Sequence, residues 1–367
     1  MMFYYLCHGI KETMWNKPYK YKEGAVVGLL VSAVGVLLQF TVGRIDWDGF
    51  AWPVNIIVLS VYILLLLAGY LLHRKIYLVE WTMTLWSAIP SMLFSAAYTL
   101  WFGITSWTEM LSFWPFVLTY LWMMNCIGLI SIQRLERLFF TKGSIRTKLM
   151  RDVPFLFNHL GLFIALIAGT LGNADLVKTY VTATVGEEPT WRPPFAIELH
   201  NFTIEEYPAQ IIIIDNETGA RIEESGWVVA ADTLFDDAAF VTCRNTLTDQ
   251  TESGWVSNGY YDIPYQFVRL DDRCSVVMPE REPKKYASEV TVHCKSGKTV
   301  DAVIEVNKPL EVDGWKIYQY GYDESMGRWS TTSVFQLVHD PWLPYVYLGI
   351  YMMLLGALCL FLLPRNN

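Results

Sequence analysis

Six long apolar segments stand out in the pattern of hydrophobic and polar positions along the chain. They have few or no internal charges and cover roughly residues 25–42, 52–72, 82–104, 111–132, 155–172 and 343–363. A transmembrane helix needs about 20 mostly apolar residues to cross the hydrocarbon core of a bilayer, and such a span must satisfy its backbone polar groups internally. The pattern therefore predicts an integral membrane protein with an α-helical transmembrane bundle of about six spans.

Short alternating segments replace this pattern between the fifth and sixth spans, in residues 173–341. Alternation of apolar and polar residues is typical of half-buried strands. The alternation shifts by one position at His200 and Asn201, which predicts a β-bulge or a turn there. A hairpin turn is expected at residues 295–298, and a last strand at 333–338 leads directly into the sixth span. We expect one antiparallel, β-rich domain with its own core.

Composition and charge separate these two regions further. The 367 residues are 53% hydrophobic and 17% charged, with a formal net charge of −8, whereas a soluble domain has about 25% charged residues. Residues 173–341 hold 28 acidic and 14 basic side chains, a balance of −14, and the rest of the chain holds 8 acidic and 14 basic side chains. This composition excludes a disordered chain and a basic nucleic-acid-binding protein, so we expect no nucleic-acid partner.

The basic residues outside 173–341 indicate the orientation in the membrane. Thirteen of these 14 residues lie on one side of the six-span arrangement, and only Arg44 lies on the other. The thirteen are Lys11, Lys17, Lys20, Lys22, Arg74, Lys75, Arg134, Arg137, Lys142, Arg146, Lys148, Arg151 and Arg365. The positive-inside rule then predicts that both termini are cytoplasmic and that the acidic region is extracytoplasmic.

The expected organisation has four parts. An N-terminal membrane region with four spans occupies residues 1–154, and a histidine-bearing transmembrane helix occupies 155–172. The β-rich extracytoplasmic domain follows in 173–341, and a C-terminal transmembrane helix with a short cytoplasmic tail completes the chain in 342–367.

Three of the six cysteines, Cys243, Cys274 and Cys294, lie in the acidic region, where disulfides can form. Three cysteines allow one bridge and leave one free thiol, and the sequence does not select the pair. The alternative, with no bridge at all, stays equally open. Their spacing matches no zinc pattern.

The sequence carries none of the usual catalytic signatures. It has no GxSxG elbow, no HExxH, no P-loop and no GxGxxG. It also has no CxxCH, so the chain is not itself a c-type cytochrome with covalent haem. We therefore assign no catalytic residue, and the remaining candidates are histidines.

His159 lies inside the fifth span, roughly 6 Å into the apolar segment from its predicted cytoplasmic end. Ionisable residues at such positions are costly and tend to face a cavity, a partner helix or a cofactor. A neutral imidazole there can ligate haem iron through one nitrogen while the other is hydrogen-bonded. The alternative is a packing histidine, hydrogen-bonded between helices, with Asn158 beside it. Gly161, Gly169 and Gly172 further along permit either close helix packing or the approach of a flat ligand.

His339 has a similar ambiguity at the outer entry to the sixth span. Its imidazole can face a ligand at the membrane surface. An N-cap by Asp340 accounts for the same neighbourhood equally well.

Two distinctive runs, VNKPL at residues 306–310 and GWKIYQ at 314–319, carry a resemblance to a known family. Further matching positions are Tyr322, Asp323, Asp340, Pro341, Tyr347, Gly349, Gly356, Ser288 and the strand at 195–207. Together they resemble the ResB-like (CcsB) family of cytochrome c biogenesis proteins, from about residue 154 to the C-terminus. Asn201 stands where the family's strand often has an acidic residue. The residues expected in a partner or domain motif are Asn307, Pro309, Leu310, Gly314, Tyr318, Gln319, Asp340 and Pro341.

The resemblance implies a function. Members of this family work with a CcsA-like partner, or fused to it, as the system II cytochrome c synthase of the bacterial cytoplasmic membrane. That complex moves haem to the outer face and attaches it through thioether bonds to the CxxCH thiols of apocytochromes c. The resemblance also implies that His159 is an axial ligand to the iron of a b-type haem that is transported or transiently bound.

This chain differs from the complete synthase complex in one respect. The tryptophan-rich haem-binding segment of the CcsA side is missing from this chain, so we expect a non-autonomous subunit of a holocytochrome c synthase. Its expected partners are a CcsA-like membrane protein, apocytochrome c and haem. The alternative is a scaffold subunit whose outer domain docks a partner or an apocytochrome without ligating haem. A transporter for another small ligand fits less well, because the spans contain few charges.

Overall fold

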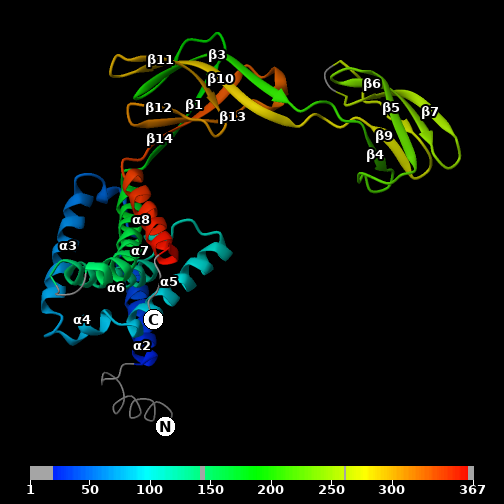
Figure 1. Ribbon diagram of the computed structural model, residues 1–367. Helices are drawn as coiled ribbons and strands as arrows, with labels where there is room; N and C mark the ends of the chain where they lie inside the picture. The colour runs from blue at the N-terminus through cyan, green and yellow to red at the C-terminus, as the bar shows by residue number, and fades with distance from the viewer. Residues whose placement is uncertain (1–19, 141–144, 260–261, 363–367) are drawn as a thin grey trace. The chain divides into compact units, whose positions relative to one another are not determined.

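The computed structural model describes residues 20–140, 145–259 and 262–362. The chain divides into two compact units, one comprising Met1–Val177 with His339–Asn367 and the other comprising Lys178–Val338. Figure 1 shows helices in the first unit and strands in the second. Of the basic residues that indicate the orientation, four lie outside the described residues: Lys11, Lys17, Lys142 and Arg365.

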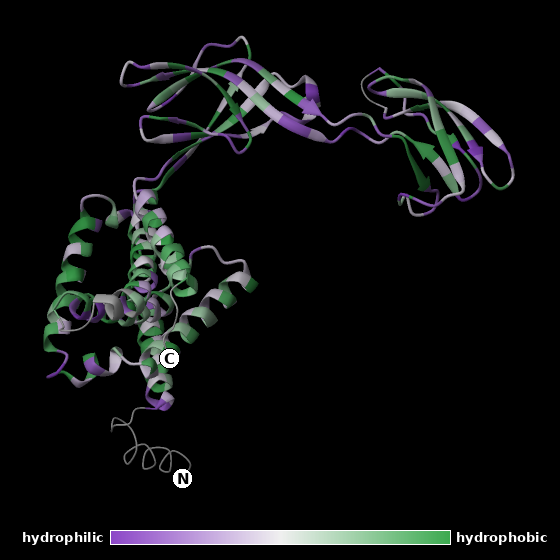
Figure 2. Ribbon diagram, in the orientation of Figure 1, coloured by the Kyte–Doolittle hydropathy of each residue, from purple (hydrophilic) through white to green (hydrophobic). Residues whose placement is uncertain are grey.

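The described part of the first unit is built from α-helices. They are α2 (Tyr21–Thr41), α3 (Val54–Leu72), α4 (Tyr77–Thr82), α5 (Leu85–Thr105), α6 (Trp114–Phe140), α7 (Ile145–Leu171) and α8 (Leu343–Leu362). All except the short α4 contain a stretch that is long and apolar enough to cross a membrane, and Figure 2 shows the hydrophobic residues along them. The prediction of a six-span helical bundle is confirmed, and the chain is a multi-pass membrane protein.

Two of these helices extend beyond the apolar segments that predict them. Helix α6 continues to Phe140, and α7 begins at Ile145, so His159 lies about 21 Å along α7 from its first residue. The 6 Å depth expected from the sequence therefore measures the apolar segment and not the helix. Hydropathy detects only the apolar part of a helix, whereas backbone hydrogen bonding continues through the charged turns beside it.

Helices α7 and α8 pack closely through glycines. A Cβ atom added to Gly161 would lie 2.6 Å from the carbonyl oxygen of Gly349, and one added to Gly349 would lie 2.4 Å from that of Gly161. Gly172 is equally confined, because its added Cβ would lie 2.4 Å from the Cβ of Trp342. Gly161 and Gly172 thus serve close helix packing, whereas an added Cβ at Gly169 would meet nothing within 4 Å.

The described part of the second unit contains four antiparallel sheets. Two of them have the strand orders β1-β14-β13-β12 and β11-β10-β3-β2, and the other two have the orders β4-β9-β8 and β5-β6-β7. The strands are β1 (Val177–Thr184), β2 (Thr190–Arg192), β3 (Phe195–Glu206), β4 (Ile212–Asp215), β5 (Trp227–Leu234), β6 (Ala238–Asn245), β7 (Thr251–Ser257), β8 (Val268–Arg269), β9 (Cys274–Val277), β10 (Pro283–Cys294), β11 (Thr299–Glu305), β12 (Leu310–Val312), β13 (Trp315–Tyr322) and β14 (Thr332–His339). The predicted β-rich class is confirmed.

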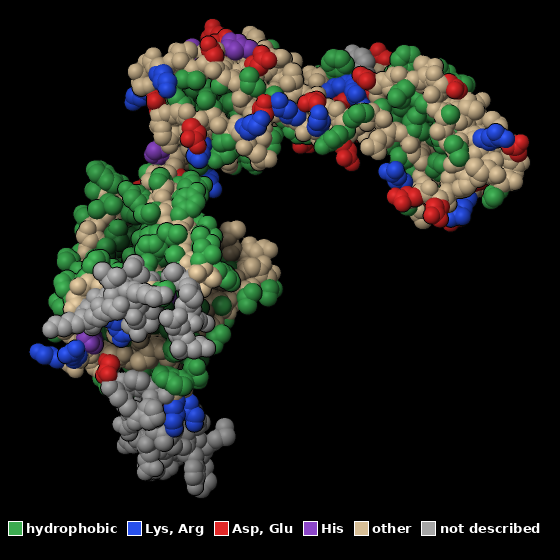
Figure 3. Space-filling view, viewed as in Figure 1, with side chains coloured by type: hydrophobic (Ala, Val, Ile, Leu, Met, Phe, Trp, Pro, Cys, Tyr) green, Lys and Arg blue, Asp and Glu red, His purple; other side chains and the backbone are tan. Residues whose placement is uncertain are grey.

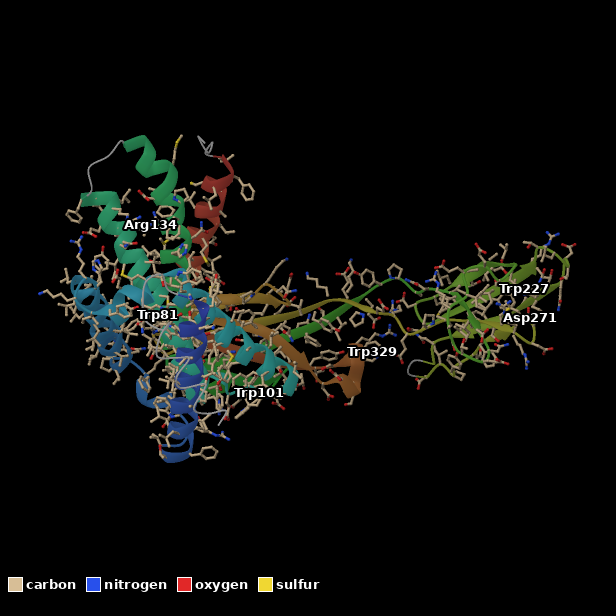
Figure 4. All side chains as sticks on the ribbon, turned by 90° about the horizontal axis from the view of Figure 1, so that it is seen from below. Trp81, Trp101, Arg134, Trp227, Asp271 and Trp329 are labelled. Atoms are coloured by element: carbon tan, nitrogen blue, oxygen red, sulfur yellow. The ribbon has the colours of Figure 1, made fainter. Side chains whose placement is uncertain are left out.

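The expectation of one core in this region is wrong, because its buried side chains form two separate clusters. The first cluster contains Phe195, Phe335 and their neighbours in the two larger sheets. The second contains Trp227, Val256 and their neighbours in the two smaller sheets. Strand β3 pairs directly with β10, so the chain between them leaves the first pair of sheets and buries its own apolar residues. Trp227 is buried in the second core, and its Nε1 donates a hydrogen bond to Asp271 Oδ2 at 3.0 Å (Figure 4).

The register of β3 against β10 confirms the expected bulge. Asn201 pairs with Glu289 and Leu199 with Val290, which leaves His200 as the extra residue. The hairpin between β10 and β11 is also confirmed, with Gly297 at a φ of 85° in its turn.

The three cysteines of this unit are buried free thiols. Cys243 and Cys274 lie in the second core, and Cys294 lies in the first. Burial, followed by the Glu252 carboxylate, raises the pKa of the Cys243 thiol to about 11. The structure therefore has no disulfide among these three residues.

Candidate functional site

His159 is held by its own helix through two contacts with Phe155. Its Nδ1 lies 2.9 Å from the carbonyl oxygen of Phe155, and the two rings stack with centroids 3.8 Å apart and planes 14° apart. Because a carbonyl oxygen only accepts hydrogen bonds, Nδ1 is the protonated nitrogen in this contact. The neutral ring then carries its lone pair on Nε2.

The Nε2 atom is the part of His159 that can bind a ligand. Among the described residues, no group forms a hydrogen bond with it, and the side chain is only partly buried. A histidine whose Nδ1 donates to a carbonyl is oriented for metal ligation through Nε2. The described residues contain no group of three or more His, Cys, Asp or Glu side chains that would hold a bare metal ion. A single imidazole nitrogen of this kind can supply one protein ligand to a metal that is otherwise held by its own cofactor.

A buried ion pair supports Phe155 from the side of α6. Arg134 donates from Nη1 to Asp152 Oδ1 at 2.9 Å, and the Asp152 side chain is 2% exposed. The Cζ atom of Arg134 also lies 4.2 Å from the ring centroid of Phe155, within range of a cation–π interaction. Asp152, Phe155 and His159 follow one another at helical spacing on one face of α7, and Figure 4 labels Arg134 beside that helix.

Asn158 belongs to a different face of the same helix. It donates from Nδ2 to the carbonyl oxygen of Pro154 at 2.9 Å, and a Cβ added to Gly356 of α8 would lie 2.8 Å from that Nδ2 atom. Asn158 therefore faces the packing surface with α8 and has no hydrogen bond with His159 among the described residues. Among the residues that the structure describes, no hydrogen bond joins His159 to another helix.

Gln319 of the sequence motif lies in a buried polar network. Its Oε1 accepts from Ser288 Oγ at 2.6 Å, and its Nε2 donates to Ser333 Oγ at 2.7 Å and to the carbonyl oxygen of Gly321 at 2.9 Å. Strands β10, β13 and β14 supply the three side chains. The structure thus brings Ser288 and Gln319 together from motif segments that are 31 residues apart.

The other motif residues form turns, partly buried strand positions and a helix cap. Asn307 has a φ of 64°, and Asp313 and Gly314 have φ values of 48° and 79° in the turn between β12 and β13. Pro309, Leu310 and Tyr318 are partly buried. Asp340 accepts at Oδ1 from the backbone nitrogens of Trp342 and Leu343 at 3.1 and 3.0 Å, and Pro341 follows it at the start of α8. The expected N-cap is confirmed, and these residues shape the fold.

Asp175 is a junction residue that the sequence pattern does not single out. Its carboxylate accepts hydrogen bonds at 2.7 Å from the Trp52 backbone nitrogen, Asn55 Nδ2 and Trp342 Nε1. Burial raises its pKa, but these hydrogen bonds and the nearby His339 outweigh burial and leave the pKa below its ordinary value. In the sequence, Asp175 is visible only as an acidic residue shortly after an apolar span. That position does not indicate which groups bind its carboxylate.

Charged side chains are distributed differently in the two units. Figure 3 shows Lys, Arg, Asp and Glu side chains over the β-rich unit and a mostly hydrophobic surface on the described helices. The motif residues lie in the charged unit or at its connection to α8, whereas His159 lies in the apolar helices. The candidate residues identified from the sequence therefore fall into two groups. The motif residues belong to the charged β-rich unit and its connection to α8, and His159 belongs to the apolar helices.

Comparisons with known proteins agree with the sequence motifs. Residues 148–334, slightly more than half of the chain, match the model of the ResB-like family. Among solved structures, the chain is similar to a "Cytochrome c Heme Lyase CcmF", with 11% identity and a TM-score of 0.32 over 95% of this chain and 46% of that chain. The chain thus spans less than half the length of that protein. No curated protein matches. The chain belongs to the ResB-like family, which supports a role in cytochrome c biogenesis.

Proposed function

We propose that this protein is a haem-handling membrane subunit of a system II cytochrome c synthase that acts with a CcsA-like partner. The observation that carries this proposal is the state of His159, whose Nδ1 donates to Phe155 while Nε2 keeps its lone pair. Membership of the ResB-like family supports haem as the substrate class. The haem-attaching chemistry belongs to the partner, because this chain lacks the tryptophan-rich haem-binding segment.

In this proposal the residues of the chain bind and orient haem. His159 Nε2 ligates the iron, and the stacked Phe155 ring fixes the plane of the imidazole. Arg134 lies over the Phe155 ring, and Asp152 pairs with Arg134. A bond from Nε2 of His159 to the haem iron would hold the haem within the apolar bundle.

The charge pattern supports an orientation for this activity. The excess of basic residues on one side of the spans favours cytoplasmic termini in a bacterial inner membrane. The acidic unit would then lie outside, where its balance of −14 would attract basic partners such as a lysine-rich apocytochrome. Haem would leave the membrane on that side for thioether attachment to CxxCH.

Co-purification with a CcsA-like partner tests the proposal. The wild-type complex is expected to show a Soret absorption band, and His159→Ala is expected to weaken or shift it. His200→Ala is the matched control, because that histidine is exposed in the β-rich unit, where its Nε2 lies 2.7 Å from Thr291 Oγ1. A His159→Ala complex with an unchanged spectrum would contradict the ligand assignment.

A scaffold subunit is the second candidate function. It is favoured by the motif residues, because Gln319, Gly314 and Asp340 stabilise the fold and form no reactive cluster. In that case His159→Ala leaves cytochrome c maturation intact, whereas removal of the β-rich unit abolishes it. The two functions therefore predict opposite results for the same single substitution.

A further inference from the structure

A second candidate ligand site lies in the helical unit, in a groove lined by residues of α3, α7 and the start of α8. Its volume is about 860 Å³, within the range of about 300–1,000 Å³ that is usual for ligand sites. Trp52, Trp342 and Tyr345 supply aromatic walls, and the side chains of α3 and α7 supply aliphatic ones. The groove therefore suits a flat, mostly apolar ligand.

One end of the groove is polar. His339 and Asp175 line it there, at the point where α7 has ended and α8 begins. Asp175 is fixed by Trp52, Asn55 and Trp342, and His339 lies near enough to contribute to its lowered pKa. Asp340 caps α8 beside them. An imidazole and a carboxylate thus line one end of a mostly apolar groove, on a locally well-fixed backbone.

The groove begins close to His159. Phe163, one helical turn after His159 on the same face of α7, lines the groove, and so does Ile164. Asp175, at the far end, is 16 residues after His159, which corresponds to about 24 Å along a helix. The groove therefore extends along α7 from the neighbourhood of His159 to the junction with α8.

We propose that this groove is a second haem-binding site, with His339 as the residue that ligates the iron. The inference rests on the proposed haem-handling function and extends it, because it gives haem a place to move to from His159 within the same chain. An apolar groove alone would hold a lipid chain. The imidazole at the polar end and the aromatic walls favour an iron porphyrin over a lipid.

Titration of the full-length chain with ferric haem tests this inference. The protein is reconstituted without a partner in phosphatidylcholine nanodiscs, and binding is followed by the Soret band. In the His159→Ala background a residual Soret band is expected from the groove. Adding His339→Ala is expected to raise the Kd of that residual site at least tenfold, whereas adding His200→Ala as a control leaves it unchanged.

A groove-filling variant makes the test independent of one substitution. Ile56 lines the groove and is 43% exposed, so Ile56→Trp in the His159→Ala background places a larger ring in the groove without disturbing the core. It is expected to weaken the residual site as His339→Ala does. Thermal unfolding of each variant identifies any loss that comes from misfolding.

The remaining outcomes separate this inference from the proposed function. If His159→Ala alone removes all haem binding, the chain has one site, and the groove assignment is overturned while the role of His159 stands. If His339→Ala and Ile56→Trp leave the residual binding unchanged, the groove is a lipid site. Absence of a Soret band in the wild-type chain also overturns the inference, because one chain supplies the whole groove. If neither histidine affects the band, both assignments are wrong.

Discussion

The Nδ1 atom of His159 lies 2.9 Å from the carbonyl oxygen of Phe155, and the two rings stack with centroids 3.8 Å apart. This intrahelical contact fixes which nitrogen carries the proton and how the ring is turned. A histidine that was free to rotate would bind a ligand less tightly, because fixing its ring on binding costs conformational entropy. The contact with Phe155 thus fixes the imidazole in the orientation that the proposed haem ligation requires.

Loss of the Phe155 ring should weaken haem binding without removing the ligand. Phe155→Leu keeps an apolar side chain but removes the stacked surface on His159. Because partners that orient a metal ligand are worth about 10–100-fold in affinity, we expect the Kd for haem to rise at least tenfold. Phe139→Leu is the control, because that side chain is 69% exposed. Equal affinities in the two variants would contradict a positioning role for Phe155.

Arg134→Ala should destabilise the helical unit strongly. It removes the Arg134 cation from the Asp152 carboxylate, whose side chain is only 2% exposed, and breaking a buried pair from one side costs about 3–5 kcal/mol. Arg44→Ala breaks a pair whose side chains are 64% and 48% exposed, which is worth about 1 kcal/mol or less. Denaturation in detergent should therefore show a much larger loss for Arg134→Ala. Similar losses in both variants would show that the Arg134 pair contributes little.

Gly161→Ala should separate α7 from α8. The added Cβ would lie 2.6 Å from the Gly349 carbonyl oxygen, and backbone cannot yield as a flexible side chain can. Gly169→Ala introduces the same atom with nothing within 4 Å, and its better helix propensity should stabilise the helix by up to about 1 kcal/mol. Thermal unfolding should distinguish the two substitutions by the sign of the effect. A neutral Gly161→Ala would mean that the crossing of α7 and α8 is looser than the structure shows.

Buried thiols should make the β-rich unit sensitive to high pH. Burial, followed by Glu252, raises the pKa of Cys243 to about 11, and burial, followed by the hydrogen bond to Asp271, raises that of Cys274 to about 11. An unfolded thiol ionises near pH 8.5, so above that pH the unfolded state binds fewer protons than the folded state and stability falls. The stabilising effect is complete below about pH 8.5 and is lost as the pH rises toward about 11.

Denaturant unfolding of the full chain at pH 8 and pH 10 measures this effect. The midpoint should fall between these two pH values by more in the wild type than in a Cys243→Ala/Cys274→Ala variant, because the variant lacks both titrating groups. Other groups titrate equally in the two proteins and cancel in the comparison. Identical pH dependence in the two proteins would contradict the raised thiol pKa values.

The elements that the sequence predicts are those specified by local pattern. The six spans follow from uninterrupted apolar residues, and the bulge at His200 follows from a one-position shift in alternation. Asp340 was recognisable as a cap because it directly precedes the first turn of α8. These features involve residues that are close together in the chain.

The features that the sequence does not predict are long-range pairings. Nothing in the alternation of β3 indicates that it pairs with β10 and that the chain between them builds a second core. Arg134 and Asp152 resemble flanking charges of a cytoplasmic loop, and their pairing depends on how α6 and α7 meet. His159 was identified from its apolar surroundings, but the tautomer that makes it a candidate ligand depends on its contact with the Phe155 carbonyl.

Imidazole rescue tests the central role of His159 most directly. His159→Gly removes the ring and leaves space for a free imidazole in the same place. In the complex with a CcsA-like partner, this variant is expected to lose most of the Soret band, and millimolar imidazole is expected to restore it. If His159→Gly retains the wild-type band in the absence of imidazole, His159 does not ligate haem and the account is contradicted.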